Sequence, residues 1–158
     1  PYEEVDIQIM VDDVLKRLDY DIQKYKVDII ILSRLPVISC DKIKLTEVFV
    51  NLINNGIKFS SKNADHPQIE INCQEQEKEY LFMVKDNGIG IEPQYHDKIF
   101  GIFKRLNKPN EYDGTGAGLT IVKKIIDDHG GRIWIESELG QGALFNFTIP
   151  KGLKNEEE

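Results

Sequence analysis

The sequence EVFVNLINNGIKFS, residues 47–60, predicts a largely buried helix with one polar stripe. At about 100° per residue, apolar side chains cover most of the helix surface. Four polar side chains share one narrow stripe on that surface: Glu47, Asn51, Asn55 and Lys58. We expect the helix to run over about 42–59, because Asp41 is a suitable N-cap immediately before the apolar spacing begins.

The polar stripe carries side chains that can bind a hard cation and a phosphate. The amide oxygens of Asn51 and Asn55 are suitable ligands for Mg²⁺. Lys58 can bind phosphate, and Glu47 can orient a water molecule or accept a proton. A solvated helix face is the simpler interpretation. However, two Asn residues four positions apart are unusual in a buried helix, because Asn is a poor helix former.

Outward from this helix, the chain alternates helical and strand-like segments. Apolar spacing predicts helices over 8–25 and 118–129, the second closed by Gly130. Short apolar runs predict strands at 27–33, 36–40, 67–76, 78–86, 132–137 and 143–149. This order predicts an α+β fold, a two-layer α/β sandwich with helices on one face of a sheet. We expect one domain over 1–150 and a flexible charged tail at 151–158.

The composition is typical of a globular domain and argues against several functions. The chain has 158 residues, a net charge of −7 and 41% hydrophobic residues. Its acidic balance argues against binding of nucleic acid or an anionic membrane surface. Cys40 and Cys73 have the apolar flanks of buried, reduced thiols, and no apolar run reaches the ~18 residues of a membrane span. We therefore expect a cytoplasmic protein, and the lack of an initial Met predicts a piece of a longer one.

The segment DNGIGI, residues 86–91, directly follows a predicted strand. A carboxylate at a strand end, here Asp86, can accept a hydrogen bond from an exocyclic amine such as that of adenine. Glycines at this point let the backbone turn tightly and approach a planar ligand. An ordinary turn is the alternative, because similar strings are frequent in turns.

A second glycine-rich segment, GTGAGL at 114–119, opens a predicted helix and can present backbone N–H groups to phosphate. It has neither the Gly-Lys-Ser/Thr ending of a P-loop nor the spacing of the dinucleotide fingerprint. The alternative interpretation of this segment is a linker. The loop before it, within 87–118, contains Phe100, Phe103, Lys104, Arg105 and Lys108. It has the composition either of a lid whose cations meet phosphate or of a surface loop with an aromatic anchor.

Together the motifs resemble the N, G1, F and G2 boxes of the catalytic ATP-binding domain of sensor histidine kinases. The matching segments are NLINNGIKFS (51–60), DNGIGI (86–91), IFGIFKRL (99–106) and GTGAGL (114–119), and GQGALFNFTIP (140–150) is similar to the closing G3 segment. Four motifs in this order are far more specific than any one of them. The stretch from FKRLN to RIWIES also resembles phytochrome-type kinases.

The resemblance implies the Bergerat ATP-binding fold, a mixed five-stranded sheet backed by three helices. It implies that Asn51 and Asn55 hold Mg²⁺, that Lys58 contacts phosphate and that Asp86 binds the adenine amine. The cofactor contacts of the glycine segments fall on Gly88, Gly90, Ile91, Thr115, Gly116, Ala117, Gly118 and Leu119. Lys104 and Arg105 are candidates for the γ-phosphate, and Thr148 for a water-mediated contact to adenine. The catalytic candidates are Glu47, Asn51, Lys58 and Arg105.

The resemblance also implies a partner, because the chain has no histidine in an acceptor-like helical motif. Its histidines, His66, His96 and His129, have structural or surface contexts. The expected function is transfer of the ATP γ-phosphoryl group to a histidine on a dimerisation domain absent from this chain, and then to a response regulator. Alternatives are an ATPase of the same superfamily, in which Glu47 activates water, and a non-catalytic nucleotide-binding module. The isolated domain is expected to be monomeric, and Gly56 occupies a position where the family usually has Ala.

Overall fold

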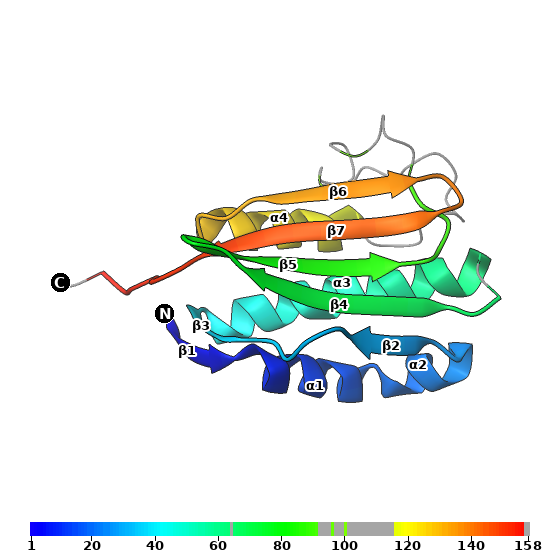
Figure 1. Ribbon diagram of the computed structural model, residues 1–158, viewed down its shortest axis with the longest axis horizontal. Coiled ribbons are helices and arrows are strands. Elements are labelled where there is room, and N and C mark those ends of the chain that lie inside the picture. The colour runs from blue at the N-terminus through cyan, green and yellow to red at the C-terminus, as the bar shows by residue number, and fades with distance from the viewer. Residues whose placement is uncertain (64, 92–95, 97–99, 101–115, 157–158) are drawn as a thin grey trace.

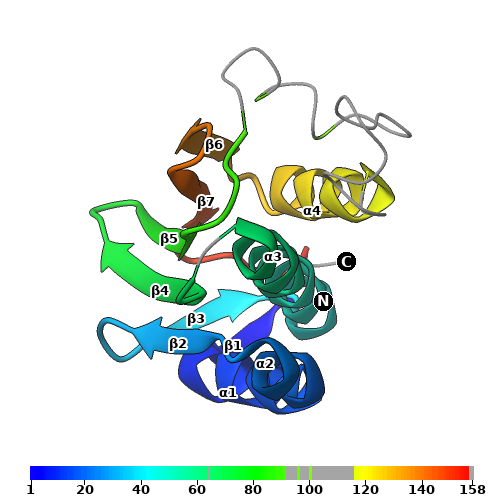
Figure 2. The same ribbon diagram turned by 90° about the vertical axis from the view of Figure 1, so that its right-hand side faces the viewer.

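The computed structural model describes residues 1–63, 65–91, 96, 100 and 116–156. Its helices cover one face of a five-stranded sheet, which gives the expected two-layer α+β arrangement (Figures 1 and 2). The elements are β1 (Glu3–Asp6), α1 (Ile7–Arg17), α2 (Asp19–Tyr25), β2 (Asp28–Ile31), β3 (Val37–Cys40), α3 (Lys42–Asn63), β4 (Gln68–Glu75), β5 (Glu79–Asp86), α4 (Gly116–Asp128), β6 (Ile133–Glu138) and β7 (Gly142–Pro150).

The sheet is mixed, as expected. Its strand order is β2-β4-β5-β7-β6. β2 pairs with β4 in parallel, and the other neighbours are antiparallel. In the register of β5 and β7, Asp86 lies opposite Ala143. The end of β5 therefore meets the start of β7, and this corner of the sheet places Asp86 beside the glycine-rich turn before β7.

Two features near the N-terminus differ from the sequence prediction. The single helix expected over 8–25 is two helices, because Leu18 ends α1 and begins α2. The described part of the chain therefore has four helices rather than three. A strand at residues 3–6, which we did not predict, pairs antiparallel with β3. Only Val5 of this strand is buried, so its own residues show no alternation that would reveal it.

Three phenylalanines join the helices to the sheet. Phe49 of α3 packs edge-on against Phe82 of β5 and Phe147 of β7, with ring centroids 5.8 and 5.6 Å apart. Phe82 and Phe147 stack on each other at 5.1 Å, and all three side chains are fully buried. Such aromatic contacts add about 0.5–1.5 kcal/mol each beyond the area they bury. This cluster fixes α3, the helix with the polar stripe, against the middle of the sheet.

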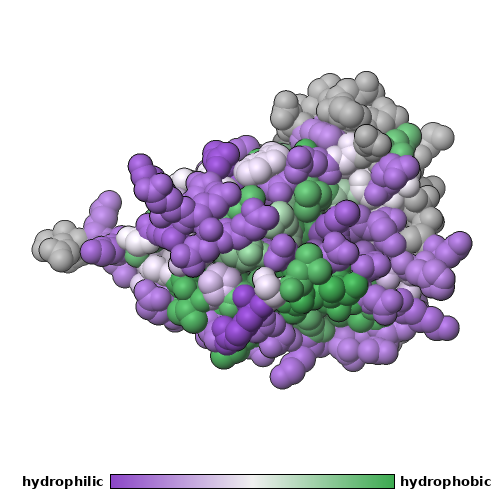
Figure 3. Space-filling model, viewed as in Figure 1, coloured by the Kyte–Doolittle hydropathy of each residue, from purple (hydrophilic) through white to green (hydrophobic). Residues whose placement is uncertain are grey.

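The opposite face of the sheet has no helix over it in the described part of the chain, and its surface is mostly polar with an apolar patch near β2 (Figure 3). Ile30 and Leu32 are exposed in this region. Within the described residues, no helix is long and apolar enough to cross a membrane. Cys40 is buried and Cys73 is partly buried, and both are free thiols, as expected.

The segment that follows β7 is hydrogen-bonded to the body of the domain through residue 155. The Lys151 N–H donates to the carbonyl of Lys78. The Ser39 hydroxyl donates to the carbonyl of Leu153 at 2.6 Å. Asn155 makes two hydrogen bonds to the backbone of Tyr2, at 2.7 and 3.0 Å. These contacts hold residues 151–155 against the body of the domain.

Candidate nucleotide site

Asp86 is a buried carboxylate at the end of β5. Its side chain is 3% exposed, and it lies among apolar residues of the core. Its Oδ1 accepts a hydrogen bond from the Gly88 N–H at 2.8 Å, and the carboxyl also accepts one from the Ala143 N–H. Burial raises the pKa of Asp86 from 3.8 to about 6, although both hydrogen bonds act in the opposite direction. In the described structure, no cation forms an ion pair with this carboxylate, so it is available to a ligand that donates hydrogen bonds.

The loop after Asp86 lies directly on the backbone of α3. A Cβ atom added to Gly88 would sit 2.5 Å from the backbone of Phe59 and 2.7 Å from the nitrogen of Ser60. Only glycine allows this approach, and Gly90 also needs its freedom because its φ is 72°. The sequence predicted an approach of this backbone to a planar ligand, and the close neighbour that the structure shows at Gly88 is the backbone of α3.

Three further contacts hold this loop in place. The amide of Asn87 accepts from the Gln68 N–H and donates to the carbonyl of His66. The Gly140 N–H donates to the carbonyl of Ile89 at 2.6 Å. The hydroxyl of Ser137 on β6 lies within 3.0 Å of both the N–H and the carbonyl of Ile91. The loop is therefore fixed from both sides before any ligand binds, which lowers the ordering cost of binding. His96, next to the same hydroxyl, lies 3.1 Å from Ser137 Oγ.

Asn55 is the buried member of the polar stripe on α3. Its side chain is 1% exposed, and its Nδ2 has no hydrogen-bond partner within the described structure. A buried amide nitrogen without a partner costs about 1–3 kcal/mol. The next residue, Gly56, is packed against Asp86, since a Cβ added there would lie 3.7 Å from the Asp86 Cβ. The structure thus brings an unpaired amide and a buried carboxylate to the same junction of α3 and β5.

The other members of the stripe lie on more open parts of α3. The Nδ2 of Asn51 donates to the carbonyl of Glu47 at 2.8 Å, which leaves the Asn51 carbonyl oxygen for a ligand. Both side chains line an open groove of about 700 Å³ that α1 and α3 share, together with Arg17, Lys42, Ile43, Thr46 and Val50. Lys58 is partly exposed, one turn beyond Asn55. The polar stripe therefore runs from a buried junction to an accessible groove.

Helix α4 starts at Gly116, two residues before the predicted start. α3 and α4 lie side by side on the same face of the sheet (Figure 2). The first four N–H groups of a helix have no partner within it. In α4 these belong to the predicted phosphate contacts Gly116, Ala117, Gly118 and Leu119. Thr115, Lys104 and Arg105 lie outside the described residues.

The structure does not bring Thr148 to the site. Strand side chains alternate between faces, and Phe145 and Phe147 point toward the helices, so Thr148 points to the other face. Its hydroxyl accepts from the Arg132 N–H at 3.0 Å. It is five residues from Ala143, which is about 16 Å along a strand. We therefore withdraw Thr148 from the candidate site.

Two residues that sequence reasoning missed take its place. The Ala143 N–H bonds to the Asp86 carboxyl. Gly142, with a φ of 93°, brings its Cα so close to the Asp86 carbonyl that a Cβ there would overlap it. A glycine at the start of an otherwise apolar strand is a signal for such a close approach.

The described elements form a recognisable kind of binding site. A buried acceptor, a glycine loop fixed on a helix, an unpaired amide and a helix N-terminus meet where α3 and α4 cover the sheet. Such groups are chemically suited to an amine, a hard cation and phosphate oxygens. The fold and the site define a nucleotide-binding α+β domain.

Comparison with known proteins identifies the family. The sequence model of the family described as histidine kinase-, DNA gyrase B-, and HSP90-like ATPase matches residues 40–153. The chain belongs to this family. It is a catalytic ATP-binding domain of the sensor histidine kinase type, because its relatives and its structural neighbours are histidine kinases.

Two phytochromes illustrate the similarity in sequence. Cyanobacterial phytochrome A of Nostoc sp. is 54% identical over 123 residues, which is 78% of this chain and 16% of that protein. Phytochrome-like protein Cph1 of Synechocystis sp. is 47% identical over 147 residues, which is 93% of this chain and 19% of that protein. The chain thus spans less than a fifth of the length of these relatives. The resemblance to phytochrome-type kinases is confirmed.

Solved structures share the whole fold. The catalytic domain of histidine kinase ThkA, in a nucleotide-free form, has a TM-score of 0.81 and 27% identity over 96% of this chain and 98% of its own. Full-length ShkA in complex with AMPPNP has a TM-score of 0.82 and 27% identity over 97% of this chain and 32% of its own. The Bergerat-type arrangement implied by the sequence motifs is therefore confirmed.

Proposed function

We propose that this chain binds Mg²⁺-ATP and transfers the γ-phosphoryl group to a histidine on a dimerisation domain outside this sequence. The observation that carries the proposal is the junction of α3 and β5, where the buried carboxylate of Asp86 and the buried, unpaired amide nitrogen of Asn55 come together beside Gly56. The phosphoryl group would then pass to a response regulator. Because ATP is the substrate, the proposal includes a cytoplasmic location.

In this proposal Asp86 selects adenine. Its carboxylate already accepts two backbone N–H groups and has further lone pairs for an exocyclic amine. Gly88, Gly90 and Ile91 form the adjoining wall, since a side chain at Gly88 would meet the backbone of α3. Guanine presents a carbonyl oxygen where adenine has its amine, so two acceptors would face each other. The pocket thus favours adenine over guanine.

Asn51 and Asn55 fit the role of magnesium ligands. Turning the Asn55 amide by 180° places its carbonyl oxygen where the unpaired Nδ2 now lies, so a cation would relieve that unsatisfied position. The carbonyl oxygen of Asn51 is available on the same stripe. Mg²⁺ bound there would offset phosphate charge. Lys58 and the first N–H groups of α4 hold the phosphates, and we retain Lys104, Arg105 and Thr115 as further candidates.

The groove shared by α1 and α3 gives the acceptor histidine a route to the phosphate. Glu47 and Asn51 both line it, so a partner side chain in this groove reaches the exposed end of the polar stripe. Glu47 then orients the acceptor or takes its proton. The structure of ThkA in complex with the response regulator TrrA concerns that protein, and we extend such a partner to this chain as part of the proposal. We expect the isolated domain to be monomeric and to bind no nucleic acid.

Calorimetric titration of ATP, with and without Mg²⁺, tests the proposal on the wild type, Asp86→Ala and Asn55→Ala. We expect wild-type binding to strengthen with Mg²⁺. Asp86→Ala should abolish binding, whereas Asn55→Ala should retain binding but lose its dependence on Mg²⁺. Asn72→Ala is the matched control, because Asn72 lies on the polar face of the sheet and bonds only to Ser33 in the described structure. No binding by the wild type at millimolar ATP would refute the proposal.

Phosphoryl transfer needs a second assay, in which the chain is mixed with the dimerisation domain of its own full-length protein and labelled ATP. We expect label on the histidine of that domain, and loss of the label with Glu47→Ala. Steady ATP hydrolysis that Glu47→Ala abolishes, without labelling of a partner, would favour an ATPase. ATP binding with neither reaction would favour a nucleotide-binding signalling module.

A further inference from the structure

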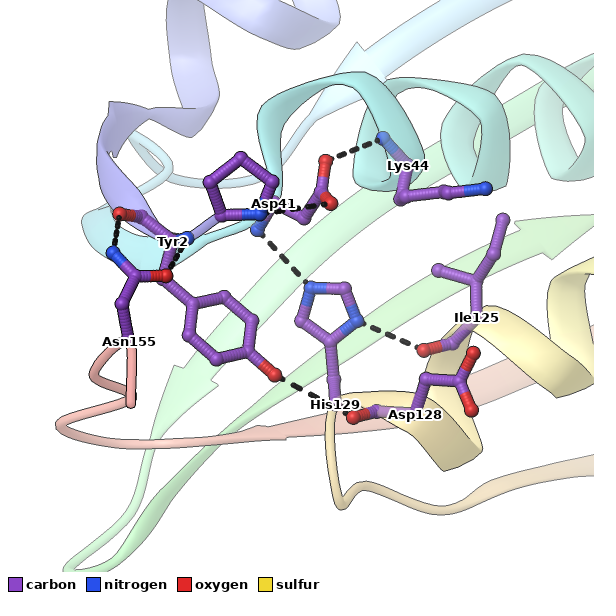
Figure 4. Close-up of polar contacts among 8 residues, drawn as sticks. Tyr2, Asp41, Lys44, Ile125, Asp128, His129 and Asn155 are labelled. Atoms are coloured by element: carbon purple, nitrogen blue, oxygen red, sulfur yellow. Dashed lines mark hydrogen bonds and ion pairs between the residues drawn. The ribbon is translucent and has the colours of Figure 1, made fainter. Parts of the chain in front are cut away.

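His129 lies between the end of α4 and the start of α3 (Figure 4). Its side chain is 4% exposed. Nδ1 lies 2.8 Å from the carbonyl of Ile125, and Nε2 lies 3.2 Å from the backbone nitrogen of Asp41. A carbonyl can only accept and a backbone N–H can only donate, so Nδ1 carries the proton and Nε2 accepts. Both contacts therefore require neutral imidazole in one tautomer.

The two bonds of His129 join helices that both carry parts of the nucleotide site. Asp41 is the N-cap of α3, with its Oδ1 accepting from the Lys44 N–H at 3.1 Å. Ile125 belongs to the last turn of α4. The helices run antiparallel, so the polar stripe of α3 and the N-terminus of α4 both lie away from this bridge (Figure 1). Asn51 is ten residues beyond Asp41, about 15 Å along the helix, and a tilt of about 4° at the bridge moves it by about 1 Å.

We propose that neutral His129 is a positioning residue for nucleotide binding, because it fixes the start of α3 against the end of α4 and so sets the spacing between Asn51, Asn55 and the N-terminus of α4. The inference rests on the proposed nucleotide site. His129 touches neither ATP nor metal in this proposal. It acts through the two helices, which transmit a change at one end to the other because helices in a packed core move as rigid bodies.

Protonation of His129 would break the bridge. A second proton on Nε2 would face the Asp41 N–H, so two donors would oppose each other. The charged and titratable groups around the ring are Asp41 and Lys44 of α3, Asp128 of α4, and Tyr2 and the amine of Pro1 in the N-terminal segment. The carboxylate of Asp41 would attract the imidazolium, and this would draw it away from the Lys44 N–H that it caps.

Three variants separate this role from general stabilisation. In His129→Gln the side-chain oxygen can take the place of Nε2 and keep the bond to Asp41. In His129→Asn the amide can take the place of Nδ1 and keep only the bond to α4. Asn155→Ala is the control in the same corner, because Asn155 makes two hydrogen bonds to Tyr2 and none to α3 or α4 within the described structure. Calorimetry with Mg²⁺-ATP measures affinity, and thermal unfolding measures stability.

We expect His129→Asn to weaken Mg²⁺-ATP binding about threefold to tenfold, the size of one lost hydrogen bond, and His129→Gln to bind like the wild type at about pH 8. Asn155→Ala should lower the unfolding temperature without changing affinity.

Three results would overturn the inference. The first is equal affinity of wild type and folded His129→Asn, and the second is an equal loss of affinity in Asn155→Ala. The third is a loss of affinity in folded His129→Gln, which keeps the bond to Asp41, and this arm decides the matter even where His129→Asn does not fold. A wild type that binds no ATP would refute both this inference and the proposed function. Wild-type binding that is insensitive to His129 would refute the inference alone.

Discussion

Replacing Asp86 with Asn should make the domain more stable while removing the group that selects adenine. Burial raises the pKa of Asp86 from 3.8 to about 6. This raised pKa corresponds to about 3 kcal/mol of destabilisation by the ionised carboxylate near pH 7. In Asp86→Asn the side-chain oxygen still accepts from the Gly88 N–H, but the bond from Ala143 is lost at a cost of about 1 kcal/mol. We expect a net gain of about 2 kcal/mol in unfolding free energy near pH 7.

The pH dependence of this gain gives the sharper test. The raised native pKa means that the folded chain binds a proton more tightly than the unfolded chain, so stability from this group increases as pH falls from about 6 toward 4. Near pH 5 the penalty for wild-type Asp86 falls to about half of its value at pH 7, and the advantage of Asp86→Asn shrinks by as much as the penalty falls. Urea unfolding of both proteins at the two pH values measures the difference. An advantage that is constant with pH, or a variant less stable than wild type near pH 7, would refute the reasoning.

The other predictions concern two glycines and a thiol. Gly88→Ala should lower ATP affinity at least about tenfold and stability by about 2 kcal/mol, because the added Cβ meets the backbone of α3; calorimetry and urea unfolding that show a silent substitution would contradict this. Gly56→Ala alone should leave the unfolding free energy nearly unchanged, because its Cβ would lie 2.9 Å from Ile69. In an Ile69→Val background the same substitution should add about 1 kcal/mol to the unfolding free energy. A double-mutant cycle of unfolding free energies without coupling would contradict this. Burial raises the pKa of Cys40 to about 12, so a thiol reagent at about pH 8 should label it only when denaturant unfolds the chain; fast labelling of folded protein would disprove this.

Local patterns predicted the central elements of the fold because those elements carry their own signals. The strand pairs flanking the predicted turns alternate or are continuously apolar, and α3 has a complete apolar surface around one polar stripe. The first strand, Glu3–Asp6, carries no such signal because it is charged. It is a strand only because β3 lies beside it. The sequence also did not predict the break at Leu18, because apolar spacing continues through it from α1 into α2.

The sequence predicted those site residues whose type is unusual for their position in a strand or helix. It did not predict contacts that depend on which face of the sheet a side chain occupies or on strand pairing. Asp86 and Asn55 have unusual chemistry for a strand end and a buried helix, and the structure buries both at one junction. Thr148 was predicted from the family resemblance, although the alternation of Phe145 and Phe147 already places it on the opposite face. Ala143 has no functional side chain, and its role lies in a backbone N–H that only the pairing of β5 with β7 reveals.

The costs to stability concentrate at one place, and this supports a ligand site there. Asp86 is a buried charge without a cation and Asn55 has an unpaired buried nitrogen, both within the described structure. A domain selected for stability alone would replace both with residues that their neighbours satisfy. A ligand with an amine for Asp86 and a cation for Asn55 would reduce the two costs together. Part of the binding energy of Mg²⁺-ATP therefore comes from the two groups that the empty fold leaves unsatisfied. Binding should raise the unfolding free energy of this domain more than that of a domain whose site lacks these two groups.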